Sequence, residues 1–324
     1  MIEFINVSKE FPGGTRAVQN VSFKVNEGEM FVIIGPSGCG KTTTMKMINR
    51  LIDSSEGEIL IQDKNILQTN IKKLRWNIGY VLQQIALFPH MTIEENIAIV
   101  PELKKWSKQA IRERVSELLN MVGLDPDTYR NRKPSELSGG QQQRVGVVRA
   151  LAGDPDIVLM DEPFSALDPI SREQLQQDIV KLQQEIKKTI VFVTHDIDEA
   201  LAIGNRICVM KEGGIVQIDK PSTILQTPKN EFVREFLGGR KDLWAAKVSE
   251  MFPLIQADSS SSINESTYIH SDNTVKEALQ ILKQLESDSV AVFDNMDYKG
   301  QLNYKDIALY LESGELNTKG GALS

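Results

Sequence analysis

The chain has 324 residues, which is enough for one large domain and a smaller one. Hydrophobic residues make up 41% and charged residues 25%, as in ordinary globular proteins, and the net charge of −7 argues against non-specific binding to nucleic acid. Two cysteines, Cys39 and Cys208, are too few for a disulfide framework, and no run approaches ~20 apolar residues, so a membrane pore would need another chain.

The first half of the chain alternates strand and helix patterns. Residues 1–34 are typical of strands and turns, and Met30–Ile34 is a continuous apolar run, as in a strand buried on both faces. A glycine-rich turn and a helical stretch at Lys41–Leu51 follow. Residues 93–119 carry apolar side chains at helical spacing, and Gly123 is the expected stop.

The same alternation continues to about residue 238 and predicts an α/β sheet. The expected elements are the strand Ile157–Met160, the helix Ser171–Lys187, the strand Ile190–Thr194 and a strand containing Cys208–Met210. The composition then shifts, and the helix Thr274–Leu285, the strand Val290–Phe293 and the helix Lys305–Leu311 predict a small α/β domain at 241–312. Residues 313–324 are expected to form a flexible tail.

A phosphate-binding loop is predicted after the first buried strand. The segment from Gly35 to Thr42 fits G-x-x-x-x-G-K-[ST] between a strand and a helix, the context that this motif requires. Lys41 should reach the β- and γ-phosphates, and the Thr42 hydroxyl should bind Mg²⁺. The alternative is a chance glycine turn before a lysine. The nucleotide contacts expected here are Gly35, Pro36, Ser37, Gly38, Cys39, Gly40, Lys41, Thr42 and Thr43.

Two carboxylates follow the second buried strand. Catalytic groups gather at the carboxyl ends of strands in such sheets. Asp161 can hold Mg²⁺ through its water shell, and Glu162 can polarise the attacking water. The alternative is a solvated acidic turn, but the position after a buried strand and downstream of the phosphate loop favours the catalytic interpretation.

A second anion site is predicted in the segment from Leu137 to Arg144, Leu-Ser-Gly-Gly-Gln-Gln-Gln-Arg. A serine and two glycines precede a helix, and helix N-termini bind anions. One ATP does not need two such sites in one chain, so we expect a dimer in which each copy caps the γ-phosphate of the other. The contacts expected are Ser138, Gly139, Gly140 and Gln141. Ser138 can also be a plain helix N-cap.

With these motifs in this order, residues 1 to about 238 resemble the ABC ATPase family. The resemblance implies a P-loop domain at 1–240, with a RecA-like core and a helical subdomain at about 88–155. It also implies that Phe11 stacks on adenine, although core packing is a competing role for it. Gln83 matches the glutamine that senses Mg²⁺ and the membrane partner, with Gln84 as the alternative register. Asp168, in Ser-Ala-Leu-Asp, matches the loop that crosses the dimer interface, and His195 matches the histidine at the γ-phosphate.

Further similarities favour an importer. Residues 87–96 and 194–200 look like the importer versions of their regions, and residues 132–238 are similar to ATPases that take up glycine betaine, carnitine and choline. The resemblance implies ATP, Mg²⁺, a homodimer, a membrane permease, a substrate-binding protein and a peripheral place at the cytoplasmic membrane face. The alternatives are an importer of amino acids or other small solutes, a soluble ABC ATPase without a transport role, and a nucleotide-binding module without turnover.

Residues 267–311 resemble one CBS motif. Asp306 matches the family's ribose-contacting Asp, whereas Asn303 stands where a Thr is usual, and an adenylate ligand is one possible consequence. The acidic stretch 286–297, which includes Asp288, Asp294 and Asp297, predicts interactions that weaken with salt. The alternative is a domain that only adds dimer contacts.

Overall fold

The structure is a computed structural model that describes residues 1–83, 85–165, 167, 169–238, 246–255, 268–285, 289–295, 297–307 and 310. The chain divides into two compact units, Met1–Pro221 and Ser222–Ser324. The sequence predicts a domain boundary near residue 240, whereas the division between the compact units falls within helix α9 (Pro221–Gln226). Helix α10 (Glu231–Phe236) therefore belongs to the second unit.

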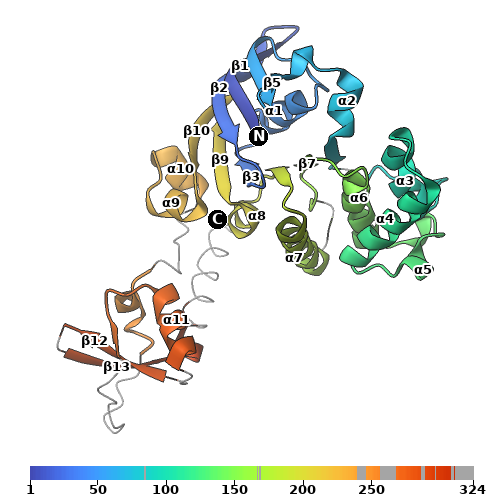
Figure 1. Cartoon of the computed structure of the whole chain (residues 1–324). Helices are drawn as coiled ribbons and strands as arrows, with labels where there is room; N and C mark the ends of the chain where they lie inside the picture. Colours follow the sequence, from blue (N-terminus) through green and yellow to red (C-terminus); the bar gives the residue numbers. More distant parts are fainter. Residues whose placement is uncertain are drawn as a thin grey trace. The chain divides into compact units, whose positions relative to one another are not determined.

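The first unit is built on a six-stranded sheet of order β10-β9-β3-β8-β7-β6 (Figure 1). The five strands from β9 to β6 are parallel, and β10 pairs antiparallel at the edge. All residues of β3, β7 and β8 are buried, which explains their continuous apolar sequences. The bounds are β3 Met30–Ile34, β6 Ile78–Val81, β7 Ile157–Asp161, β8 Thr189–Val193, β9 Arg206–Lys211 and β10 Gly214–Asp219.

A smaller antiparallel sheet of order β2-β1-β4-β5 shares a hydrophobic core with the central sheet. Its strands are β1 Ile2–Phe11, β2 Thr15–Val25, β4 Glu56–Ile61 and β5 Lys64–Asn65. Phe23 joins the two sheets, because its ring stacks on Phe4 of β1 and on Phe31 of β3, with centroids 4.4 and 5.3 Å away. The predicted α/β architecture is confirmed.

Helices flank the central sheet and form a separate group beside β6. Helices α3, α4 and α6 pack on one another, α4 also packs on α5, and α6 packs against β6 (Figure 1). The stretch predicted to be helical from 93 to 119 forms two helices, since Ser107 caps a new one. Gly123, with φ +68°, follows α4 as expected. The helices are α1 Lys41–Ile48, α2 Ile71–Trp76, α3 Ile93–Leu103, α4 Lys108–Met121, α5 Pro126–Tyr129, α6 Gly139–Leu151, α7 Pro169–Ile186 and α8 Ile197–Ile203, with short 3₁₀ turns at Ile66–Gln68 and Pro134–Glu136.

The second unit contains a three-stranded sheet of order β11-β12-β13 and helix α11 (Val275–Leu285). The strands are β11 Tyr268–His270, β12 Ser289–Asp294 and β13 Asp297–Asn303, and a 3₁₀ turn spans Val248–Met251. Buried apolar residues of these elements form a core of their own. Residues 304–307 and 310 are helical, in agreement with the predicted last helix; the expected tail at 313–324 and Asp288 lie outside the described residues.

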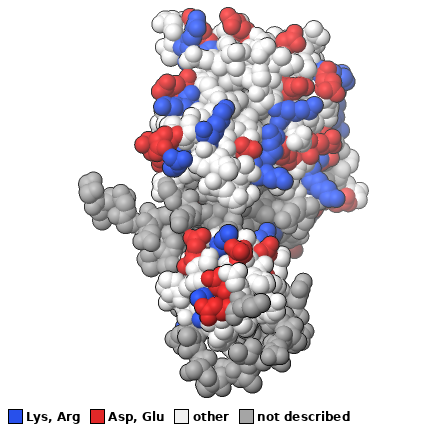
Figure 2. All heavy atoms as spheres, turned by 90° about the vertical axis from the view of Figure 1, so that its left-hand side faces the viewer, with Lys and Arg blue, Asp and Glu red and all other residues white. Residues whose placement is uncertain are grey.

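The described surface carries charges of both signs. On the face shown in Figure 2, lysine and arginine side chains are interspersed with aspartate and glutamate over the described residues. Among the helices that the structure describes, none is long and apolar enough to cross a membrane.

Candidate active site

Two glycines in the loop after β3 lie where a side chain would collide with the neighbouring backbone. Gly35 has φ +151°, and a Cβ there would lie 2.2 Å from the Met210 carbonyl oxygen. Gly40 has φ +101°, and its Cβ would lie 2.3 Å from the Ala17 carbonyl oxygen. The loop tip between them, residues 36–38, is exposed. The bare backbone leaves N–H groups accessible to an anion, as the motif predicts.

Helix α1 begins at this loop without a side-chain cap, because its N-cap is Gly40. The first N–H groups of a helix then remain available and carry a partial positive charge. The Lys41 ammonium donates to the carbonyl oxygens of Gly35 and Pro36 at 2.8 and 3.0 Å, and the residue is only 6% exposed. The only formal positive charge in this segment, residues 35–42, therefore lies over the loop.

The predicted magnesium residues are adjacent. The Thr42 hydroxyl donates to Asp161 Oδ1 at 3.0 Å and so connects α1 to the end of β7. Asp161 is 5% exposed; burial raises the pKa of its carboxyl and the neighbouring Glu162 adds to this, while the Thr42 bond opposes it. Tyr80, which sequence analysis did not single out, donates its hydroxyl to Asp161 Oδ2 at 3.4 Å. A tyrosine in the otherwise apolar strand pattern Ile-Gly-Tyr-Val was the available signal.

Three predicted catalytic side chains meet at one carboxylate oxygen. The Gln83 amide donates to Glu162 Oε2 at 3.1 Å, and His195 Nδ1 lies 3.2 Å from the same oxygen. The sheet order explains this, because Gln83, Glu162 and His195 follow the neighbouring parallel strands β6, β7 and β8. The alternative residue Gln84 lies outside the described residues. Glu162 also has φ +45°, and its N–H is bonded to the Val193 carbonyl oxygen at 2.9 Å.

The predicted second anion site lies at the start of α6. Ser138 is the N-cap, as anticipated, and it forms a capping box with Gln141: each side chain accepts a hydrogen bond from the other residue's N–H, at 3.3 and 3.0 Å. Both Ser138 and Gly139 are exposed. A Cβ at Gly139 would meet nothing within 4 Å, so packing inside the chain does not explain this glycine. Asp168 lies outside the described residues.

Phe11 and Gln143 each make a contact that bears on the candidate site. Phe11, at the end of β1, is half-buried, with the Lys9 ammonium 5.2 Å from its ring centroid, so part of the ring remains accessible. Gln143 was not predicted; it is buried and its amide donates to the Pro163 carbonyl oxygen at 2.6 Å, next to Glu162. Nothing in its sequence context separates Gln143 from the other glutamines of α6.

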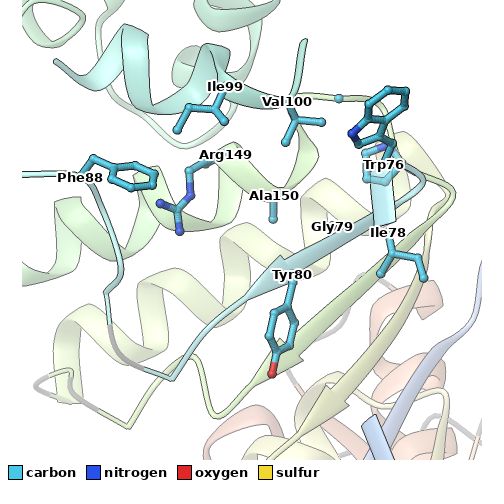
Figure 3. A pocket seen from close by; sticks show the side chains of 11 residues that line it. Trp76, Ile78, Gly79, Tyr80, Phe88, Ile99, Val100, Arg149 and Ala150 are labelled. Atoms are coloured by element: carbon cyan, nitrogen blue, oxygen red, sulfur yellow. The ribbon is translucent and has the colours of Figure 1, made fainter. Parts of the chain in front are cut away.

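A cavity of about 240 Å³ lies between β6 and the helices α3 and α6. Phe88 and the Arg149 guanidinium line one end, and Trp76 lies at the other (Figure 3). Burial lowers the pKa of Arg149, whose guanidinium donates to the Ala86 carbonyl oxygen at 2.5 Å. The cavity thus adjoins the segment that follows Gln83.

A glycine loop at an uncapped helix, an adjacent Thr–Asp pair and a glutamate with a histidine and a glutamine define a P-loop nucleoside triphosphatase. A sequence profile described as ABC transporter matches residues 18–165. The chain is 50% identical over 295 residues to the choline transport ATP-binding protein OpuBA of Bacillus subtilis, covering 91% of this chain and 76% of that protein.

It is also 47% identical over 310 residues to the carnitine transport ATP-binding protein OpuCA of Listeria monocytogenes, covering 95% of this chain and 76% of that one. Among solved structures, the dimer of the ATP-binding cassette MJ0796 bound to ADP and Pi is 38% identical, with a TM-score of 0.62 over 68% of this chain and 99% of the other. The chain belongs to the family of ABC transporter ATP-binding proteins and is an ATPase of that family, as the sequence motifs predict.

Proposed function

We propose that the chain is the ATP-hydrolysing subunit of an importer that takes up a compatible solute such as glycine betaine, carnitine or choline. The observation that carries the chemistry is the meeting of Gln83 and His195 on one oxygen of Glu162. The solute class is supported by the 50% identity to a choline transport protein over 91% of the chain.

ATP binding begins at the phosphate loop. The N–H groups at the start of α1 face the phosphates, and Lys41 exchanges its contacts with loop carbonyls for the β- and γ-phosphates. The accessible side of the Phe11 ring stacks on adenine, a role supported by its partial exposure. A Cβ at Gly35 or Gly40 would collide with backbone, which is consistent with a loop that must stay bare.

Oxygen ligands suit Mg²⁺, and the Thr42 hydroxyl and the Asp161 carboxylate lie within 3.0 Å of each other. These two groups would hold the ion, and Gln83 is proposed to contact it as well. The bound ion would neutralise the charge of the phosphates. Among the described residues, no group of three or more His, Cys, Asp or Glu is placed to hold a metal ion, so phosphate and water oxygens would supply the other ligands. The residues therefore fit the ion.

Glu162 polarises the attacking water. Its Oε2 is held by Gln83 and His195, so Oε1 is the oxygen that accepts a hydrogen bond from the water. His195 has a side chain that is 61% exposed, and it contacts the γ-phosphate once nucleotide is bound. Fixed donors and acceptors around the transferred group are the main source of rate in this reaction class.

Two copies of the chain form the complete site. Ser138, Gly139, Gly140 and Gln141 of one copy contact the γ-phosphate bound by the other, and Asp168 belongs to the loop at the interface. The exposure of Ser138 and the empty surroundings of Gly139 support this arrangement. Mixing Lys41→Ala and Ser138→Arg subunits should restore some ATPase activity, since each heterodimer has one intact site. A lack of recovery in confirmed heterodimers contradicts independent shared sites.

The permease docks at the cavity beside β6, and the chain is peripheral at the cytoplasmic membrane face. The cavity combines aromatic walls with the half-buried Arg149 guanidinium, which suits an amphipathic segment of a partner. It also adjoins the segment after Gln83. Binding of the permease at this cavity can therefore shift the catalytic glutamine, Gln83. Substitution of Phe88 by Ser, on an otherwise intact chain, should weaken co-purification with the permease and leave ATP binding unchanged.

Glu162→Gln tests the chemistry. The variant should keep ATP binding and lose most turnover, because the amide cannot take up the water's proton. Glu58→Gln, which removes an exposed carboxylate from β4, is the matched control. ATPase assays on the reconstituted transporter measure both. Turnover of Glu162→Gln close to that of the control would contradict the assignment.

Transport assays test the solute. Proteoliposomes containing the chain, its permease and a substrate-binding protein should accumulate labelled choline, carnitine or glycine betaine when ATP is enclosed. Accumulation of an amino acid instead would support the other importer class. Failure to co-purify with any integral membrane protein would support a soluble ABC ATPase.

We propose that residues 241–312, which lie within the second unit, form a CBS-like regulatory domain that works in pairs within the dimer. Its small α/β sheet supports this. Asp306 is 8% exposed and exchanges hydrogen bonds with Asn303 at 3.0 Å in both directions, so one of its carboxylate oxygens already serves the helix start. Removal of residues 241–324 should preserve ATP hydrolysis and alter its response to salt or to an adenylate. If full-length and truncated transporters hydrolyse ATP equally at every concentration of salt and adenylate, only a structural role remains for this domain.

A further inference from the structure

The loop that carries His195 is fixed by a buried threonine–glutamate pair. The Thr194 hydroxyl donates to Glu199 Oε2 at 2.5 Å, and the same hydroxyl accepts the N–H of Asp196 at 2.9 Å. The Glu199 side chain, on α8, is only 7% exposed. One hydroxyl therefore connects the residues on both sides of His195 to a buried carboxylate.

Asp196 fixes the other end of this turn. Its Oδ1 caps α8 by accepting the N–H groups of Asp198 and Glu199 at 2.8 and 3.2 Å. The N–H of Thr194 is bonded to the Ile33 carbonyl oxygen of β3 at 3.2 Å. The backbone around His195 is thus held, while its side chain is 61% exposed and 3.2 Å from Glu162.

Arg172, in the first turn of α7, faces both carboxylates. Its guanidinium lies 3.7 Å from Asp196 Oδ2 and 3.9 Å from Glu199 Oε1. These distances are ion pairs rather than hydrogen bonds, and the buried Nε of Arg172 has no hydrogen-bond partner among the described residues. A buried donor without a hydrogen-bond partner is unfavourable, so a shift that shortens the contact to Glu199 is favoured.

The charge of Arg172 also matters to Glu199. Burial raises the pKa of the Glu199 carboxyl and the charge of Asp196 adds to this, whereas the Thr194 hydroxyl, Arg172 and His195 lower it. The ionised carboxylate is the stronger acceptor for the Thr194 hydroxyl. Loss of Arg172 would weaken the contact that holds the turn.

We propose that Arg172 and Glu199 are positioning residues for ATP hydrolysis, which hold His195 against Glu162 and couple the first turn of α7 to the His195 loop. The inference rests on the proposed catalytic roles of His195 and Glu162. Arg172 follows the segment expected to cross the dimer interface, so a movement of the start of α7 changes the Arg172 contacts and, through them, the turn at His195.

The test is the ATPase activity of the reconstituted transporter with Arg172→Gln, Arg172→Lys and Glu199→Gln. The glutamine variants should lower kcat by ~10- to 100-fold, the size expected from misplacement of a catalytic group, with the ATP Kd within about twofold. Arg172→Lys should recover part of the loss. Arg112→Gln, which removes an exposed arginine of α4, is the matched control and should have normal activity.

Two further measurements separate positioning from folding. Thr194→Ser keeps the hydroxyl and should retain activity, whereas Thr194→Val should not, even where both have the same melting temperature. Arg172→Gln added to His195→Ala should cause little further loss, because both act through one group.

Normal kcat in the glutamine variants, or full additivity in the double variant, overturns the inference. If His195→Ala and Glu162→Gln themselves keep turnover, the proposed chemistry fails instead, so the two failures are distinguishable.

Discussion

Gly139→Ala should make the chain more stable and less active. Gly139 is the first residue of α6, it is exposed, and a Cβ there would meet nothing within 4 Å. Alanine is the better helix former and reduces the freedom of the unfolded chain, so the free energy of unfolding should rise by ~0.5–1 kcal/mol. Urea unfolding of the full-length chain, followed by far-UV circular dichroism, measures this change.

The same methyl group should obstruct a phosphate held by the other copy. A tenfold loss of turnover corresponds to ~1.4 kcal/mol of activation free energy, and we expect at least that. The ATPase rate of the reconstituted transporter is the assay, with the affinity for ATP measured separately. Stability and activity then change in opposite directions, which a defect of folding cannot produce.

Gly146→Ala is the matched control, because Gly146 lies on the same helix and a Cβ there also meets nothing within 4 Å. It should give a similar gain in stability with normal turnover. Full turnover of Gly139→Ala, or an equal loss in Gly146→Ala, would refute the reasoning that a partner's nucleotide requires the glycine.

The remaining predictions concern the phosphate loop and the buried glutamate. Gly40→Ala should lower the free energy of unfolding by ~2–4 kcal/mol, because its Cβ would lie 2.3 Å from the Ala17 carbonyl oxygen at φ +101°, and the urea midpoint measures it. Thr42→Val should lower magnesium-dependent ATPase activity at least tenfold, whereas Thr42→Ser should retain the bond to Asp161 and most activity. Burial raises the pKa of Glu199, because the buried position favours the neutral carboxyl. The resulting contribution to the free energy of unfolding is complete below the ordinary glutamate pKa and is lost as pH rises through the raised value. Glu199→Gln should remove that part of the pH dependence of the urea midpoint.

The sequence predicts the residues of the active site but not which of them contact one another. Continuous apolar runs such as Met30–Ile34 predict buried parallel strands, and motif spacing predicts the loop around Lys41. The contact of Gln83 and His195 with Glu162 depends on the strand order β8-β7-β6, which is set by packing between segments distant in the chain. Periodicity within one segment contains no information on that order.

Local chemistry was also overlooked in two places. Residues 93–119 were expected to be helical, and the end of α3 near Lys104 followed by the capping residue Ser107 divides them. Ser107 is a recognisable N-cap, so this division was available from the sequence. Tyr80 was also available, as the one side chain with a hydroxyl in an apolar strand. Gln143 was not, because one glutamine among several in a helix acquires meaning only through its partner.

Helix α6 connects the segment of residues 138–141, where the helix begins, to the rest of the site in its own chain. Gln143 donates to the Pro163 carbonyl oxygen at 2.6 Å, directly after Glu162, and Arg149 donates to the Ala86 carbonyl oxygen at 2.5 Å, in the segment after Gln83. Gln143 is buried and Arg149 is half-buried, and hydrogen bonds weaken steeply when stretched.

Displacement of Ser138 by a partner's phosphate would therefore move α6 together with two backbone segments, rather than α6 alone. Arg144 adds two further links, because its guanidinium lies 3.0 Å from Asp178 of α7 and donates to the Val122 carbonyl oxygen at 2.8 Å. A rigid helix with contacts to four segments transmits small movements without needing a flexible hinge of its own. The segment of residues 138–141 can then influence the Glu162 carboxylate of its own chain through packing alone, even though it is expected to bind the nucleotide of the other copy.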